Sequence, residues 1–244
     1  MILKKESGLF LKNANLNSKG TEMKEWLQRY FSQWFALEKV TSAYNRLEVI
    51  RQKGKLVLNA PHVNYSFGSL HEVFQSVFRQ LAPDFSQIKS VLILGFGAGS
   101  VAHILQKENG CPCSITGVEI DEEVIALAKK HFGLGELKNL DIHISDAAGF
   151  LSKETKPYHF IVVDIFLDHR TPEKFLHSAF LKTLYDHLLP GGTVLFNYLI
   201  YDHEAREKAV VFEEIFRETF QPSHRLTFKG HSKNIVFTGR KSYR

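Results

Sequence analysis

The chain has 244 residues, of which 44% are hydrophobic and 23% are charged. This composition is that of an ordinary globular protein and excludes a disordered tail or a fibrous repeat. Thirty-one Lys and Arg residues against 26 Asp and Glu give a formal net charge of +5, a mild excess that indicates a soluble surface.

The two cysteines, Cys111 and Cys113, are too few for a disulfide framework or a four-ligand zinc site. The sequence therefore favours a reducing, cytoplasmic setting and no bound metal. Residues 1–5 are basic, but the apolar segment of a signal peptide does not follow, and no apolar run has the length of a membrane span. We expect neither export nor membrane insertion.

The first 85 residues are expected to form a small N-terminal element of a helix and a β-hairpin. Residues 1–20 indicate a loose lead-in with a short strand at 2–11. Aromatic residues then recur at helical spacing and predict an amphipathic helix over 22–38. Its aromatic face is expected to pack in the core, with an oligomer contact as the alternative.

Two short β-prone runs follow, at 46–50 and 55–58, and the Lys-Gly turn between them predicts the hairpin. A second helix is expected from Ser69 to Leu81, ahead of Pro83.

From Ser90 onward, apolar strands alternate with amphipathic helices, which predicts a parallel sheet covered on both faces. The last two strands, 224–229 and 233–239, predict a closing antiparallel hairpin. We therefore expect a Rossmann-like α/β domain over 86–244, with a mostly parallel sheet. The other predicted strands are 90–94, 114–120, 140–145, 158–166 and 193–200, and the predicted helices are 101–108, 122–132, 172–188 and 204–220.

A glycine cluster follows the first strand of this domain. Gly95, Gly97 and Gly99 lie between that strand and a helix. Glycines allow a sharp turn and a close approach to a ligand, and the free amides of the helix start face the same place. The spacing is G-x-G-x-G, not the dinucleotide pattern G-x-G-x-x-G. Any tight strand-to-helix turn could use such glycines, so the cluster alone is a weak signal.

Two carboxylates follow the next two strands. Glu119 lies about 20 residues beyond the loop, where it can accept hydrogen bonds from both ribose hydroxyls of a nucleoside. Asp146 could accept from the exocyclic amine of an adenine, and we assign Ile120 and Ala147 beside these acids to the same site. Asp121 is expected to cap the following helix. Open α/β sheets bind ligands at the carboxyl ends of their strands, so the three signals together predict a nucleoside site.

These residues resemble the class I S-adenosylmethionine-dependent methyltransferases. The resemblance implies that fold, and S-adenosylmethionine or its decarboxylated form as the cofactor. Within the superfamily the chain is most similar to spermidine synthases, the polyamine aminopropyltransferases, over roughly residues 45–240. The segments that carry the resemblance are Gly95-Phe-Gly-Ala-Gly, Val118-Glu-Ile-Asp, Ser145-Asp-Ala, Val162-Val-Asp and Leu189-Pro-Gly-Gly.

The chain departs from the spermidine synthase pattern at several positions. Ala98 stands where the family's glycine loop has the Asp that helps to hold the amine of the decarboxylated cofactor and would repel a carboxylate. The family's catalytic Asp-x-x-Asp-Pro corresponds to Asp164 and Asp168, which are one residue further apart and lack the proline, and Leu70 replaces the family's Tyr. The diamine pocket therefore looks dismantled, whereas the nucleoside pocket looks intact.

Asp164 is the predicted catalytic residue in either enzyme class. In aminopropyl transfer it would deprotonate the attacking amine, because an ammonium has no lone pair. In methyl transfer it would orient the acceptor or bind the cofactor's ammonium group, since that reaction depends mainly on in-line placement. Asp168 and Tyr198 are assigned to the acceptor. The resemblance places His71 beside the cofactor, and the alternative is a helix-start His packed beneath the loop.

We therefore predict an S-adenosylmethionine-dependent methyltransferase with a spermidine-synthase-like fold. The alternatives are a divergent polyamine aminopropyltransferase and an inactive nucleoside-binding scaffold. The predicted partner is a small-molecule acceptor; nucleic acid is disfavoured, because no basic run interleaved with aromatics lies near the site. Spermidine synthases are commonly dimers or tetramers, so the aromatic helix at 22–38 could serve a homodimer contact.

Overall fold

The computed structural model describes residues 36–52, 54–61, 63–167, 170–228 and 234–243. The strand expected at 2–11 and nearly all of the helix expected at 22–38 lie outside them. The last residues of that predicted helix belong instead to strand β1 (Ala36–Thr41), so the prediction is wrong there. β1 pairs with the next strand, and this ladder of hydrogen bonds outweighs the helical spacing of a few side chains.

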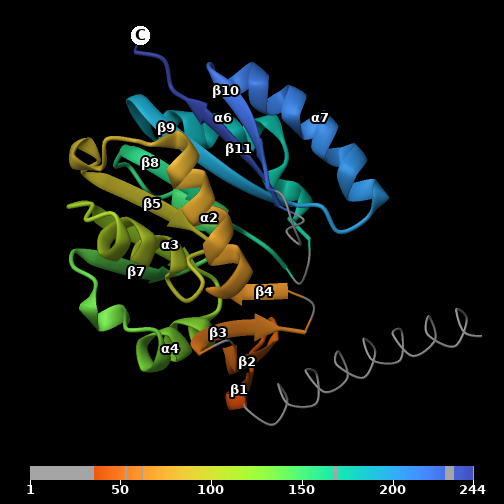
Figure 1. Cartoon of the computed structure of the whole chain (residues 1–244). Helices are drawn as coiled ribbons and strands as arrows, with labels where there is room; N and C mark the ends of the chain where they lie inside the picture. Colours follow the sequence, from red (N-terminus) through yellow and green to blue (C-terminus); the bar gives the residue numbers. More distant parts are fainter. Residues whose placement is uncertain (1–35, 53, 62, 168–169, 229–233, 244) are drawn as a thin grey trace, which may run out of the picture.

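An antiparallel sheet of four strands, β1 to β4, precedes the large sheet. Its hairpin of β2 (Arg46–Gln52) and β3 (Lys55–Ala60) confirms the predicted pair of strands. β4 (Val63–Ser66) pairs with β3, and the chain then enters α2 (Gly68–Leu81), the second predicted helix. Figure 1 shows this sheet at the lower end of the molecule, beside α4 (Glu122–His131).

The large sheet has seven strands in the order β10-β11-β9-β8-β5-β6-β7. The strands from β9 to β7 run parallel, and β11 and β10 close one edge in antiparallel register. This arrangement confirms the predicted α/β fold with a terminal hairpin. The strands are β5 (Ser90–Leu94), β6 (Ser114–Glu119), β7 (Leu140–Ile144), β8 (Tyr158–Val163), β9 (Leu188–Leu199), β10 (Ser223–Thr227) and β11 (Asn234–Arg240).

Both faces of the large sheet are buried. In β5, Val91 and Ile93 belong to one apolar cluster with residues of α2 and α4, whereas Leu92 and Leu94 belong to a second cluster on the other face. Two covered faces explain why these strands are apolar almost throughout. In Figure 1, α2 lies across the front of the sheet. The other helices are α3 (Ser100–His103), α5 (Ala147–Leu151), α6 (Ser178–Asp186) and α7 (His203–Thr219).

Two predicted helices differ in the structure. The segment 172–188 contains a short 3₁₀ turn, Glu173–Phe175, and then α6, because His177 between them is extended with φ −95° and ψ 153°. The segment 101–108 begins as α3 and continues as a π-helical turn, Ile104–Glu108.

Within the described residues, no helix combines the length and the apolar character needed to cross a membrane. In the same part of the chain, no three or more His, Cys, Asp and Glu side chains form a group that could hold a metal ion.

Candidate active site

A cavity opens at the carboxyl ends of the parallel strands, where β7, β6, β5 and β8 lie side by side. The loops that follow these strands line it, together with residues of the small N-terminal sheet. Six of the predicted cofactor residues and the predicted catalytic residue meet there: Gly95, Gly97, Glu119, Ile120, Asp146, Ala147 and Asp164. The other lining residues are Tyr44, Asn64, Tyr65, Val118, Ser145, Ile165, Phe166, Leu167, Pro172, Lys174 and Phe175.

Gly95 and Gly97 of the glycine loop after β5 line the cavity next to the end of β8. Gly95 has φ +81°, and a Cβ there would collide with the backbone carbonyl of Asp164. Gly97 has φ +56°, and a Cβ there would lie 3.3 Å from the backbone oxygen of Tyr65. Glycine is needed at both positions, because the backbone is left-handed and its neighbours are close.

Glu119 is held rigidly at the end of β6. Its Oε2 accepts a hydrogen bond from the Gly97 amide at 2.8 Å, and its Oε1 accepts from the amides of Ile120 and Asp121 at 2.9 and 3.2 Å. The residue is only 3% exposed. Burial raises the pKa of Glu119 to about 6, although these three amides oppose the shift. A carboxylate has about four lone-pair sites, and three of those of Glu119 are taken, so its Oε2 can still accept one hydrogen bond, as from a ribose hydroxyl.

Asp146 has two partners at the far side of the cavity. Its Oδ2 accepts from the Gly149 amide at 3.1 Å and caps α5, while Lys174 Nζ donates to its Oδ1 at 2.6 Å. Burial acts to raise the pKa of Asp146, but the bonds from Lys174 and Gly149 outweigh it and lower the pKa. A nucleobase amine that binds Asp146 must therefore share the carboxylate with Lys174.

Asp164 follows β8 and faces the cavity at its other end. Burial, with a further contribution from the charge of Glu119, raises the pKa of Asp164 to about 7. Asn197 Nδ2 donates to Asp164 Oδ1 at 2.8 Å and partly offsets that shift. Asn234 on β11 donates in turn to Asn197 Oδ1 at 2.9 Å, which fixes the orientation of the Asn197 amide. Asp164 is thus a positioned group that gains and loses a proton near neutral pH.

The small N-terminal sheet supplies one wall of the cavity, and sequence reasoning missed this wall. Tyr65 on β4 and Tyr44 before β2 line the site, and burial raises the pKa of Tyr65. Ser42 Oγ donates to Asp121, which also caps α4. These contacts join segments far apart in the chain, so no local motif could have indicated them. Lys174 was missed because its segment was predicted as regular helix.

Several predicted site residues do not line this cavity. Gly99 is the N-cap of α3, with φ +89°. The neighbouring Ala98, which stands at the position of the family's loop Asp, is fully buried in the core. Tyr198 lines a separate cavity near α7. Asp168 lies outside the described residues.

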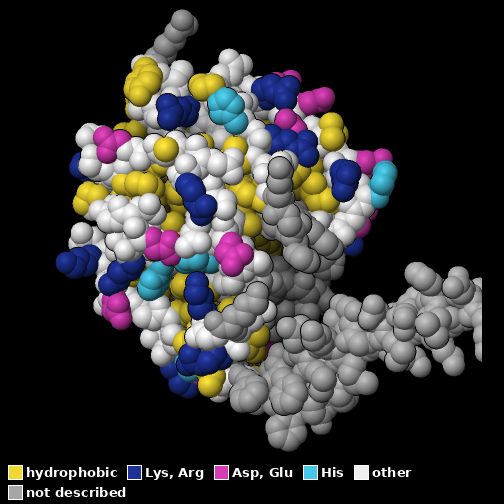
Figure 2. Space-filling view, in the orientation of Figure 1, with side chains coloured by type: hydrophobic (Ala, Val, Ile, Leu, Met, Phe, Trp, Pro, Cys, Tyr) yellow, Lys and Arg dark blue, Asp and Glu magenta, His cyan; other side chains and the backbone are white. Residues whose placement is uncertain are grey.

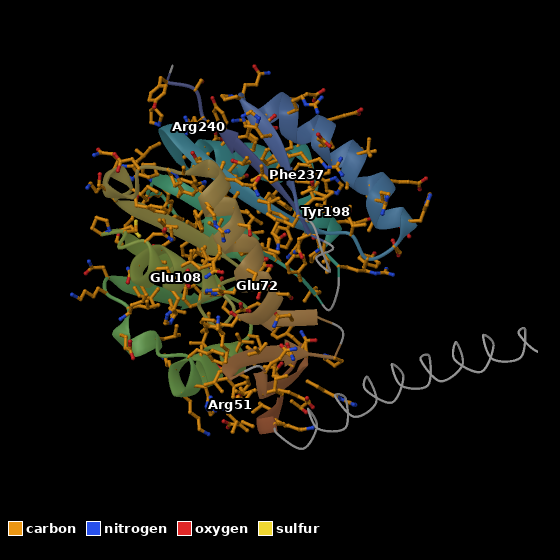
Figure 3. The ribbon with its side chains drawn as sticks, viewed as in Figure 1. Arg51, Glu72, Glu108, Tyr198, Phe237 and Arg240 are labelled. Carbon is orange, nitrogen blue, oxygen red and sulfur yellow. The ribbon has the colours of Figure 1, made fainter. Side chains whose placement is uncertain are left out.

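His71 is likewise absent from the cavity wall, which agrees with its alternative interpretation as a His packed beneath the loop. Its Nδ1 lies 2.6 Å from Ser100 Oγ, and its Nε2 lies 2.6 Å from Glu108 Oε1. Phe67 stacks on the His71 ring with centroids 5.2 Å apart. Figure 2 shows histidine and acidic side chains side by side on this face, and Figure 3 labels Glu108 there. His71 therefore supports the start of α3.

Comparison with known proteins identifies the family to which the chain belongs. A family model described as "Spermine/spermidine synthase domain" matches residues 71–199. The chain is 33% identical over 108 residues to a probable polyamine aminopropyl transferase of Bifidobacterium longum, which covers 44% of this chain and 24% of that protein. It is 26% identical over 125 residues to the human eEF1A lysine and N-terminal methyltransferase, covering 46% of this chain and 18% of that protein. The matched segment thus spans at most a quarter of each of these two relatives.

Among solved structures, a probable spermidine synthase from Corynebacterium glutamicum superposes with a TM-score of 0.68 at 20% identity. The superposition covers 83% of this chain and 79% of that one. At this identity the likeness supports the fold alone.

Proposed function

Because the chain belongs to the spermine/spermidine synthase family, we propose that it transfers an aminopropyl group from decarboxylated S-adenosylmethionine to an amine on a small molecule. The methyl transfer predicted from the sequence becomes the second candidate. Both reactions move an alkyl group from a sulfonium to an acceptor, and they differ in the donor and in the nucleoside that is released.

Asp164 carries the proposal. Amines are protonated at neutral pH and must lose a proton before they attack carbon. A carboxyl group whose pKa is about 7 and which faces the cavity can take that proton at the working pH. The amine nitrogen then bonds to the carbon next to the sulfonium, the carbon–sulfur bond breaks, and its electron pair stays on sulfur. The products are the alkylated amine and 5′-methylthioadenosine.

The charge of the cavity supports the decarboxylated donor. Its described lining side chains include three carboxylates, of Glu119, Asp146 and Asp164, and one cation, Lys174, which is paired with Asp146. Decarboxylated S-adenosylmethionine carries a sulfonium and an ammonium, whereas S-adenosylmethionine carries an added carboxylate. That carboxylate finds no unpaired cationic side chain among the described lining residues, and burying it unpaired is costly.

Two observations support the second candidate, methyl transfer: one is a residue of the glycine loop, and the other is a relative of the chain. Ala98 lacks the carboxylate that the resemblance assigns to the loop of aminopropyltransferases. A protein lysine and N-terminal methyltransferase is also among the relatives. An amine acceptor would use Asp164 as the base in this reaction too.

The test compares the two donors with the same amines. Purified protein is incubated with each donor and with 1,4-diaminobutane or other amines, and the nucleoside products are quantified. We expect 5′-methylthioadenosine from the decarboxylated donor, and a loss of at least about a hundredfold in Asp164→Asn, the size of a general-base contribution. Asp141→Asn, which changes an exposed carboxylate on β7, is the matched control. S-adenosylhomocysteine as the main product would instead support methyl transfer.

A further inference from the structure

Lys174 lines the cavity of the candidate active site beside Asp146, and no step of the proposed reaction uses it. Its Nζ donates to Asp146 Oδ1 at 2.6 Å and lies 4.9 Å from the centroid of the Phe175 ring. Phe175 is only 2% exposed, so its ring gives the ammonium a fixed cation–π support. These two contacts hold the Lys174 ammonium at the cavity wall, although more than half of the side chain is exposed.

The Lys174 ammonium has more hydrogen-bond donors than Asp146 uses. A lysine ammonium carries three N–H groups, and one of them donates to Asp146. The carboxylate of the neighbouring Glu173 lies 2.7 Å from Lys208 Nζ, so it has a cation of its own. Two N–H groups therefore remain with which Lys174 can donate to a ligand that binds at Asp146.

The Asp146 carboxylate can still accept one hydrogen bond from a ligand. It has about four lone-pair sites, two of which accept from Lys174 and from the Gly149 amide. The Ala148 amide forms a further, weaker bond that helps to lower the pKa of Asp146. Ala147 also lines the cavity, and as the first residue of α5 its amide has no partner within the helix. The site thus offers one acceptor together with donors from two separate segments.

The edge of an adenine has the complementary pattern, because its exocyclic amine is a donor next to the ring acceptors N7 and N1. We propose that Asp146 accepts from this amine, that the Ala147 amide donates to N1, and that Lys174 donates to N7. The inference rests on the proposed function, because both candidate donors are adenosine derivatives. Lys174 then determines specificity for a base with an acceptor at N7, since a hydrogen bond from an ammonium is charge-assisted and strong.

The binding test compares 5′-methylthioadenosine with its 7-deaza analogue, in which a C–H group replaces N7 and the amine remains. In calorimetry the wild type should bind the analogue about tenfold more weakly, as for the loss of one hydrogen bond to a charged donor. In Lys174→Met the two nucleosides should bind within about twofold of each other. This ratio cancels any general effect of the substitution on Asp146, so a purely structural ion pair would not change it.

Two controls test the assignment of N7. Lys182→Met removes a lysine that pairs with Asp186 on α6 at 2.8 Å, and it should keep the tenfold ratio. The 1-deaza analogue should lose the same factor in the wild type and in Lys174→Met, because the Ala147 amide is present in both. Equal affinities of the wild type for 5′-methylthioadenosine and the 7-deaza analogue would overturn the proposal. A 1-deaza loss that disappears in Lys174→Met would overturn it as well.

The binding ratio separates this proposal from the proposed function. If the ratio changes as expected but neither donor supports transfer, the proposed function fails and the Lys174 contact stands. If transfer occurs but Lys174→Met keeps the wild-type ratio, the contact is refuted and the proposed function stands. If 5′-methylthioadenosine does not bind, the contact is refuted whatever the result for transfer.

Discussion

Replacing Asp164 by Asn should stabilise the protein above neutral pH while it slows transfer at least about a hundredfold. Burial raises the pKa of Asp164 to about 7 from an ordinary value of 3.8. Between these two values the folded protein holds a proton that the unfolded chain has lost, so the free energy of unfolding falls as the pH rises. At about 1.4 kcal/mol for each pKa unit, the group costs the folded state about 2 kcal/mol at pH 5 and about 4 kcal/mol at pH 8.

Urea denaturation of the wild type and of Asp164→Asn at both pH values measures this cost. The variant's gain in the free energy of unfolding should be larger at pH 8 than at pH 5 by about 2 to 3 kcal/mol. Glu72→Gln, at an exposed position of α2 and without an ion-pair partner among the described residues, should show a much smaller pH-dependent gain. A variant that is destabilised at pH 8, or whose gain is equal at the two pH values, would refute the reasoning about Asp164.

Three further variants test the contacts of the site. Asn197→Leu removes the donor to Asp164, so the acidic limb of the pH–rate profile should move up by about one pH unit; an unmoved limb contradicts this contact. Glu119→Gln should weaken the binding of 5′-methylthioadenosine about tenfold in calorimetry, because the carboxylate no longer accepts from ribose, and unchanged affinity would count against the nucleoside site. Gly95→Ala should lower the free energy of unfolding by more than about 2 kcal/mol, because the new Cβ would collide with the Asp164 backbone. The control is Gly110→Ala, where the backbone is also left-handed but no atom lies within 4 Å of the added Cβ; it should cost about 1 kcal/mol. Equal losses in the two variants would contradict the close approach at Gly95.

The sheet, and the meeting of the glycine loop with the strand-end carboxylates, could be predicted because both depend on local patterns. Apolar strands alternating with helices require a parallel sheet with two covered faces. The carboxyl ends of such strands share one edge, so Gly95, Glu119, Asp146 and Asp164 had to meet although they are spread over 70 residues of the chain.

The contributions of the small N-terminal sheet and of β11 could not be predicted in the same way. Tyr65 reaches the cavity from a separate sheet, and Asn234 acts on Asp164 only through Asn197 on the neighbouring strand. Such contacts depend on tertiary packing and leave no spacing in the sequence. Lys174 was not recognised as a site residue, because the sequence predicts one regular helix over 172–188. In the structure Lys174 lies in a short 3₁₀ turn, which the extended backbone at His177 separates from α6.

The central claim is a nucleoside site whose charge favours the decarboxylated donor. Calorimetric titration of the protein with decarboxylated S-adenosylmethionine and with S-adenosylmethionine tests it most directly. We predict that both bind at one site and that the decarboxylated form binds about tenfold more tightly, since an unpaired carboxylate costs at least about 1.4 kcal/mol in such a cavity. Tighter binding of S-adenosylmethionine, or no binding of either donor, would contradict the account.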